Sequence, residues 1–245
     1  MERNIQTQAI VLAVRKYGEL HKSVTLLCPE LGLVDAIIYG GRKGKKTALA
    51  PLFSISDMQL YYNPVKKEYS IVEAVSSFIP SSISEDLGST YAAAFFCEII
   101  TKAPSDDSNQ TFLLLRDALV TLDNAPTLRK RIIISFIWQL MHIAGTAPNL
   151  GFCPSCDKVY GQDEVLYFSS SLSSPCCKSC SDNQNLILPP GARRYLSFTS
   201  EKNFLDSVEV ELNPAAEERI ISYMLKWASI FAQTNLKTLL QAELF

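Results

Sequence analysis

The chain has 245 residues, of which 47% are hydrophobic and 20% are charged, and its formal net charge is −2. This composition is typical of a soluble globular protein with one large or two smaller cores, and it excludes nucleic-acid binding through global basicity. The longest apolar run, residues 132–144, is too short to span a bilayer. Seven cysteines and a polar N-terminus without an export signal predict a protein of the reducing cytoplasm.

Residues 8–78 have the pattern of short strands separated by turns. The expected strands cover residues 8–14, 21–28, 33–39, 54–62 and 69–78. Each is an apolar run rich in β-branched or aromatic residues, and the turns between them contain Gly, Pro or Asn. No long helical pattern lies between these strands, which argues against parallel βαβ units. We therefore expect a small closed five-stranded barrel.

A basic loop interrupts this pattern after the third strand, with the sequence Gly40-Gly41-Arg42-Lys43-Gly44-Lys45-Lys46. Three glycines and four cations in seven residues cannot pack a core, so we expect an exposed, mobile loop. Residues 1–80 hold ten Lys and Arg against seven Asp and Glu, whereas residues 81–245 hold thirteen against eighteen. The positive charge is thus concentrated in the barrel segment.

We interpret the loop cations Arg42, Lys43, Lys45 and Lys46 as a phosphate-binding cluster. Three further cations at neighbouring strand ends extend it: Arg15, Lys16 and Lys22. The alternative is a solvated loop that only aids solubility. Aromatic rings of the same segment can stack on bases, although packing of the barrel core is the simpler interpretation for them. These rings belong to Tyr17, Tyr39, Phe53, Tyr61 and Tyr62.

From residue 82 onward the hydrophobic period becomes helical. Ser82 and Glu85 have the spacing of a capping box, which predicts a helix over residues 86–102. Further helices are expected over residues 110–122 and 128–144, and the last of these is apolar nearly all round, so it should be buried.

The helix expected over residues 128–144 begins with three cations, Arg129, Lys130 and Arg131. The helix dipole disfavours cations at this end, so their position favours an acidic partner. A solvated basic helix end is the alternative interpretation.

Two Cys-x-x-Cys pairs follow, Cys153 with Cys156 and Cys177 with Cys180, separated by twenty residues. Four thiolates on two tight turns are typical of a tetrahedral zinc site with bonds of about 2.3 Å. Because four protein ligands leave no open position, the one Zn²⁺ should be structural. Cys176 is the fallback for Cys177, and the alternative to a metal site is a set of free or disulfide-bonded thiols.

Cys28 and Cys97 stand alone in apolar stretches and should be core residues. After the cysteine segment we expect a short helix over residues 192–198 with an exposed Arg193 and Arg194. A long helix should follow with Asn213 as its N-cap, and a final short helix should cover residues 236–244.

The overall expectation is an α+β multidomain chain. Its parts are a barrel domain (1–80), a helical domain in two segments (81–150 and 186–245) and a four-cysteine insert between them (151–185). With two histidines and no nucleotide-binding loop, no catalytic constellation can be assembled, so we do not expect an enzyme.

The order of these parts resembles that of the bacterial recombination mediator family RecO. The residues that carry the resemblance are Ala9-Ile-Val-Leu, Tyr17-Gly-Glu-Leu-His-Lys, Gly32-Leu-Val-Asp-Ala-Ile-Ile-Tyr-Gly-Gly-Arg, Phe152-Cys-Pro-Ser-Cys and Leu236-Lys-Thr-Leu. One departure is Cys28, where the family tends to have Thr.

The resemblance implies an oligonucleotide/oligosaccharide-binding (OB) barrel that binds single- and double-stranded DNA without sequence specificity. It also implies annealing of complementary strands and, together with RecR, loading of RecA onto DNA coated by single-strand-binding protein, at the bacterial nucleoid and without covalent chemistry. The helical domain of the family binds the acidic tail of single-strand-binding protein, for which Arg129, Lys130 and Arg131 are candidates.

Two other classes stay open at this stage. The chain could be a zinc-ribbon adaptor that binds only protein, and salt-sensitive DNA binding that depends on the loop cations would exclude this class. The chain could also be a metal-dependent nuclease. The lack of a clustered set of His, Asp and Glu residues argues against this class.

Overall fold

The computed structural model describes residues 3–244, with the backbone alone for residues 45, 184 and 242–244. The chain divides into two compact units, one that runs up to Pro126 and one that runs from Thr127 to Glu243. We describe each unit by itself; the four-part division expected above stays a prediction. No helix among the described residues has both the length and the apolarity that a membrane crossing requires.

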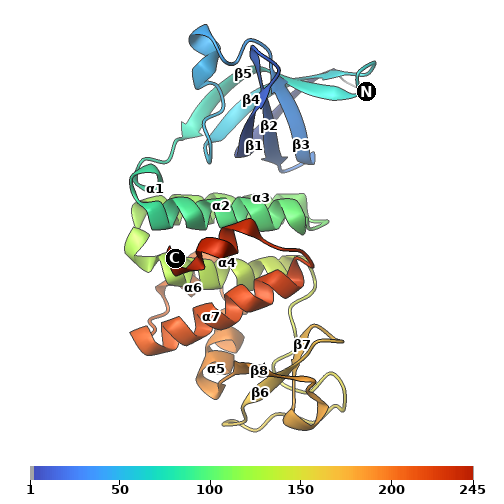
Figure 1. Cartoon of the computed structure of the whole chain (residues 1–245), viewed down its shortest axis with the longest axis vertical. Coiled ribbons are helices and arrows are strands. Elements are labelled where there is room, and N and C mark those ends of the chain that lie inside the picture. The colour runs from blue at the N-terminus through green and yellow to red at the C-terminus, as the bar shows by residue number, and fades with distance from the viewer. Residues whose placement is uncertain (1–2, 245) are drawn as a thin grey trace. The chain divides into compact units, whose positions relative to one another are not determined.

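The first unit begins with a closed barrel of five strands: β1 (Asn4–Tyr17), β2 (His21–Cys28), β3 (Gly32–Ile38), β4 (Ile55–Asn63) and β5 (Glu68–Phe78). Their order around the barrel is β1-β2-β3-β5-β4, and only the β3–β5 pair is parallel (Figure 1). The predicted five-stranded barrel is therefore confirmed. The strands arise from alternating apolar residues, whose side chains fill the interior while their neighbours face outward.

The barrel core is aliphatic. Its buried members are Ala9, Val11, Val24, Leu26, Cys28, Ala36, Ile38, Ala50, Met58, Leu60 and Ile71. Burial raises the pKa of the Cys28 thiol to about 12, so this cysteine is a neutral core residue, as predicted. The same holds for Cys97, which is buried in helix α2 with a raised pKa.

Three helices complete the first unit: α1 (Ser82–Glu85), α2 (Leu87–Lys102) and α3 (Ser108–Asn124). The predicted capping box is wrong, because Ser82 and Glu85 both lie inside α1. Asp86 caps α2 instead, since its carboxylate accepts the Ser89 N–H at 2.8 Å.

The second unit holds the buried helix α4 (Arg129–Ile143), which ends before Gly145, a residue with φ of +65°. Helix α4 packs against α6 (Phe204–Glu209) and α7 (Pro214–Phe231), and the rings of Trp138 and Trp227 lie 5.9 Å apart. Asn213 caps α7 as predicted, with its side chain accepting the Ala216 N–H at 2.8 Å.

Between α4 and α7 the chain forms a small sheet in the order β7-β6-β8 and then helix α5 (Pro190–Thr199). The strands are β6 (Leu166–Ser169), β7 (Ser174–Cys176) and β8 (Asn183–Leu188) (Figure 1). The chain also contains the 3-10 helices η2 (Pro126–Leu128), η3 (Lys178–Cys180) and η4 (Lys237–Leu244). The second cysteine pair lies in the connection between β7 and β8.

Candidate metal centre and nucleic-acid surface

Two tight turns hold the four sulfur atoms of the cysteine pairs. On the first turn the Asp157 N–H donates to the Cys153 carbonyl at 2.9 Å, and the Cys153 N–H donates to the Lys158 carbonyl at 2.9 Å. On the second turn Cys177 directly follows β7, and the Cys180 N–H donates to its carbonyl at 3.1 Å. Each Cys-x-x-Cys pair therefore presents both sulfurs from one reversal of the backbone.

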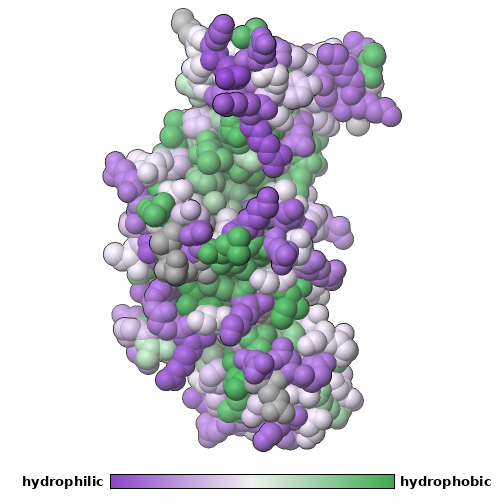
Figure 2. All heavy atoms as spheres, in the orientation of Figure 1, coloured by the Kyte–Doolittle hydropathy of each residue, from purple (hydrophilic) through white to green (hydrophobic). Residues whose placement is uncertain are grey.

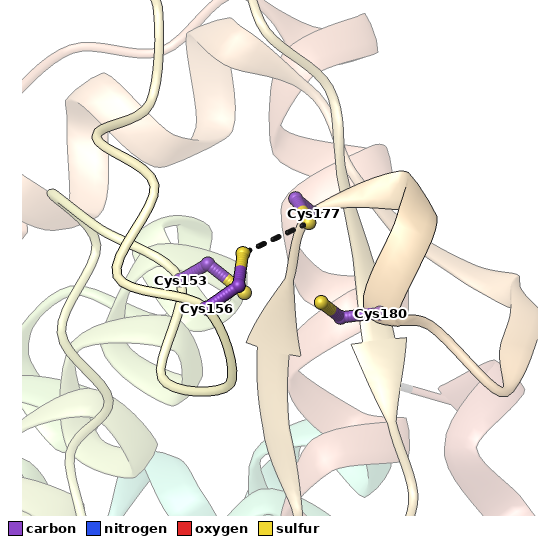
Figure 3. A group of neighbouring side chains, drawn as sticks. All are labelled: Cys153, Cys156, Cys177 and Cys180. Atoms are coloured by element: carbon purple, nitrogen blue, oxygen red, sulfur yellow. Dashed lines mark hydrogen bonds between the residues drawn. The ribbon is translucent and has the colours of Figure 1, made fainter.

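The sulfurs of Cys153, Cys156, Cys177 and Cys180 all lie within 4.8 Å of one another and point toward a common centre (Figure 3). The Cys156 and Cys177 Sγ atoms are 3.8 Å apart. An ideal tetrahedron with bonds of about 2.3 Å also places its sulfurs about 3.8 Å apart, so this geometry fits a four-thiolate metal ion. Cys176 is buried and lies outside this group.

Electrostatics also favour a cation at this centre. Burial opposes ionisation of Cys153, but the backbone N–H groups of Cys177, Ser155 and Cys156 outweigh it and lower the pKa of Cys153 to about 6. Hydrogen bonding to Cys177 and Cys156 raises the pKa of Cys180 to about 12. Crowded thiols thus ionise one at a time, and a bound dication would remove the penalty for the others. The residues can hold a metal ion.

Arg193 joins the cysteine segment to α5. Its guanidinium donates through Nη2 to the carbonyls of Gly161 and of Gln162, the latter at 2.9 Å, and lies 5.7 Å from the Tyr160 ring centroid. The Tyr160 hydroxyl in turn donates to the Pro175 carbonyl at 3.4 Å. The sequence-based expectation of an exposed Arg193 is wrong, because only 7% of this residue is exposed.

The cations of the first unit gather around the β1–β2 turn. Lys16 pairs in register with Lys22 across that turn. The basic loop packs on it, since the Arg42 N–H donates to the Leu20 carbonyl at 3.1 Å and Lys22 Nζ donates to the Thr47 carbonyl at 2.8 Å. The β1–β2 hairpin carries Arg15, Lys16 and Lys22, and the basic loop that packs on it carries Arg42, Lys43 and Lys46.

Hydrophilic residues dominate this end of the barrel, at the top of Figure 2. The sequence predicted an exposed, mobile loop but not the regular structure that part of this loop adopts. Residues Gly44–Ala48 form the 3-10 helix η1, and Arg42 Nη1 donates to the Glu19 carbonyl at 2.8 Å. Lys43 and Lys46 are exposed to solvent, whereas the side chain of Lys45 lies outside the described part of the chain.

The barrel aromatics fall into two groups. Phe53 is buried, and the rings of Tyr62 and Tyr69 pack 5.0 Å apart, so the packing interpretation holds for these residues. Tyr17 and Tyr39 are 47% and 39% exposed and stand outside the core. The Tyr39 hydroxyl donates to the Glu68 carboxylate at 2.6 Å, which raises the pKa of Tyr39.

A family model described as "Recombination protein O N terminal" matches residues 1–78, and one described as "Recombination protein O C terminal" matches residues 84–228. The chain belongs to the RecO family. The resemblance drawn from the sequence is thus confirmed, and with it the class of a DNA repair protein.

Curated RecO relatives match along most of their length. The "DNA repair protein RecO" of Alkaliphilus metalliredigens is 24% identical over 222 residues, which cover 88% of this chain and 89% of that protein. The protein of the same name from Symbiobacterium thermophilum is 28% identical over 227 residues, with coverage of 88% and 89%. That of Thermoanaerobacter sp. is 27% identical over 187 residues, with coverage of 73% and 71%.

A different side of the RecO barrel is acidic. An open groove of about 610 Å³ on strands β1, β4 and β5 is lined in part by Glu30, Asp57 and Glu73. Glutamines 6, 8 and 59 share this groove, and no Lys or Arg among the described residues lines it. Three carboxylates repel a polyanion, so this groove is an unfavourable surface for phosphate groups.

The cations at the start of α4 have partners within the second unit. Lys130 forms an ion pair with Glu218, and Arg131 Nε lies 3.4 Å from the Glu217 carboxylate. Arg131 also donates through Nη1 to the Val208 carbonyl at 3.2 Å. Sequence reasoning missed these pairs because the acidic residues lie almost ninety positions further along the chain, on α7.

Proposed function

We propose that this RecO-family chain binds single- and double-stranded DNA without sequence specificity and anneals complementary strands. Together with RecR, it helps to load RecA onto DNA coated by single-strand-binding protein. The observation that carries this proposal is the gathering of cations around the β1–β2 turn of an OB-type barrel, from strand ends and the basic loop together. Lys45 belongs to the proposed cluster through its position in that loop.

The physical basis is phosphate neutralisation. Annealing brings two polyanions together, and a cationic surface lowers their mutual repulsion while it releases condensed counterions. Lysine and arginine contacts to phosphate carry no base information, which suits a protein that must act on any sequence. The acidic groove on β1, β4 and β5 confines the DNA to one end of the barrel.

For the metal centre we propose one Zn²⁺ held by Cys153, Cys156, Cys177 and Cys180. A four-thiolate shell has no open position for water or substrate, so the ion supplies cross-linking and no chemistry. It joins the turn after Phe152 to the end of β7. Arg193 and Tyr160 then transmit that constraint to α5, which fixes the cysteine segment on the helices of its own unit.

For the acidic tail of single-strand-binding protein we propose contacts with Arg129, Lys130 and Arg131. Lys130 and Arg131 already have carboxylate partners on α7, so the tail would exchange places with Glu217 and Glu218. Exchange of one carboxylate for another costs little Coulomb energy, which makes these positions compatible with a reversible contact.

The decisive experiment measures DNA affinity against salt concentration. Substitution of Arg42, Lys43, Lys45 and Lys46 by Ala should lower the slope of log K against log salt by about 0.7 for each lost phosphate contact on single strands. The matched control removes two exposed lysines of the second unit, Lys178→Ala with Lys226→Ala. It should keep the wild-type slope.

Annealing is tested with complementary strands coated beforehand by single-strand-binding protein, with RecR added in parallel. A quadruple variant with the wild-type slope refutes the loop assignment. A wild-type protein that ignores oligonucleotides in dilute buffer refutes DNA binding altogether and leaves the protein-only adaptor as the better proposal. Strand cleavage with added divalent metal would instead identify a nuclease.

A further inference from the structure

We propose that Tyr17, His21 and Tyr39 form a platform on which unpaired bases stack, so that the cationic end of the barrel holds single strands in preference to duplex. This inference rests on the proposed DNA binding and names the residues that would select the form of the DNA. It starts from two exposed tyrosines that the barrel core does not use.

The three rings come from two turns that meet at one place. Tyr17 ends β1 and pairs in register with His21, the first residue of β2, and Tyr39 directly follows β3. The centroids of Tyr17 and His21 are 6.4 Å apart, and those of His21 and Tyr39 are 5.1 Å apart with an edge-on angle of 74°. The rings therefore form one continuous aromatic surface.

Hydrogen bonds hold two of these rings in place. His21 Nδ1 accepts the Gly40 N–H at 3.0 Å, which fixes the imidazole against the start of the basic loop. The Tyr39 hydroxyl is bound to Glu68, and Lys66 Nζ lies 5.9 Å from the Tyr39 ring centroid. A preorganised surface loses little conformational freedom when a base stacks on it.

The surroundings suit a nucleotide chain. Arg42 donates through Nη1 to the Glu19 carbonyl on the turn between Tyr17 and His21, and Lys66 Nζ lies near the Tyr39 ring, so phosphates can lie on these cations while bases lie on the aromatic surface. The β1–β2 and β4–β5 loops frame the same place, which is the ligand-binding region of OB folds. Glu68 is the carboxylate that faces Tyr39, and Lys66 lies 3.6 Å from it.

Stacking needs a free base face, and in a duplex each face is covered by the neighbouring base pair. The cations alone bind both forms of DNA, whereas stacking on the rings adds affinity only for the unpaired form. Loss of one ring should weaken single-strand binding by roughly five- to a hundredfold, the usual range for a base stacked on an aromatic side chain. The salt slope should stay constant, because no phosphate contact is lost.

The test compares the full chain with Tyr17→Leu, Tyr39→Leu and the double variant, using labelled oligothymidylate and a duplex of equal length over a salt series. Single-strand affinity should fall while duplex affinity and both slopes persist. Tyr39→Phe keeps the ring and should bind like wild type. Phe198→Leu is the matched control, because Phe198 is 57% exposed with Lys202 Nζ 4.7 Å from its ring centroid, yet it belongs to the second unit.

Wild-type single-strand affinity in the double variant overturns the platform, and so does an equal loss of single-strand and duplex binding. In both cases a steep salt dependence of the wild type leaves the proposed DNA binding intact. A wild-type protein that binds neither form removes the proposed function, and the platform falls with it.

Discussion

Replacement of Cys177 by Ser tests the metal centre at its most specific point. A serine hydroxyl stays protonated at neutral pH and does not replace a thiolate ligand of zinc. Loss of partners that only orient a ligand already costs 10- to 100-fold in affinity, so loss of a ligand should cost at least about 100-fold. At a fixed free-metal concentration this removes about 2.7 kcal/mol of metal-linked stability.

Cys176 provides the matched control one position away. Its side chain is fully buried, and its pKa is raised to about 11, mainly by that burial. It therefore behaves as a small apolar residue. Cys176→Ala should lower the free energy of unfolding by about 1 kcal/mol through the small cavity it leaves, without loss of metal.

The assay is metal analysis after exhaustive dialysis, followed by thermal unfolding with and without a chelator. Wild type and Cys176→Ala should keep one ion per chain and should lose stability when the chelator is added. Cys177→Ser should be metal-poor and insensitive to the chelator. The opposite outcome for the two variants would identify Cys176 as the metal ligand in place of Cys177. A wild-type protein without metal would refute the zinc centre itself.

Three further predictions concern the second unit. Arg193→Ala should lower the free energy of unfolding by about 1.5–3 kcal/mol, because it removes the buried guanidinium that donates to the Gly161 and Gln162 carbonyls. Arg194→Ala, at an exposed neighbour, should cost less than about 1 kcal/mol in the same denaturant titration. In metal-free protein the depressed pKa of Cys153 means that its thiolate stabilises the fold fully above about pH 9 and that this contribution is lost as the pH falls through about 6. The thermal midpoint should therefore fall over that window, and Cys153→Ser should remove this part of the dependence. If Lys130 contacts the acidic tail of single-strand-binding protein, Glu218→Gln should strengthen binding of a tail peptide in a calorimetric titration, and an unchanged affinity would count against that contact.

The barrel could be predicted because its signal is local. Alternate residues of a strand belong to the barrel core, as Val24, Leu26 and Cys28 do in β2, and the turns between strands contain residues that end strands. The closure of the sheet by the parallel β3–β5 pair is a non-local event that no single strand encodes. Helix α7 could also be predicted from the sequence, because Asn213 and Pro214 mark its start.

The errors come from partners that are distant in sequence or from competing local signals. Ser82 and Glu85 have capping-box spacing, but Asp86 offers a stronger cap because its carboxylate accepts both the N–H and the hydroxyl of Ser89. The exposed placement expected for Arg193 failed because its acceptors, Gly161 and Gln162, lie about thirty residues away. The strands of the cysteine segment are too short for periodicity to reveal them.

Charge segregation explains how a chain with net charge −2 can serve as a polyanion binder. Long-range repulsion from acidic surfaces is screened beyond about 8 Å at physiological ionic strength, whereas contacts at the cationic barrel end act within that distance. Under the proposed function, the acidic groove would set the orientation of the bound DNA and the cationic end of the same barrel would set its affinity. On this view, neutral substitutions of Asp57 and Glu73 should broaden the DNA footprint on the barrel. They should not steepen the slope of log K against log salt, since counterion release depends on the number of phosphate contacts at the β1–β2 turn and not on the net charge.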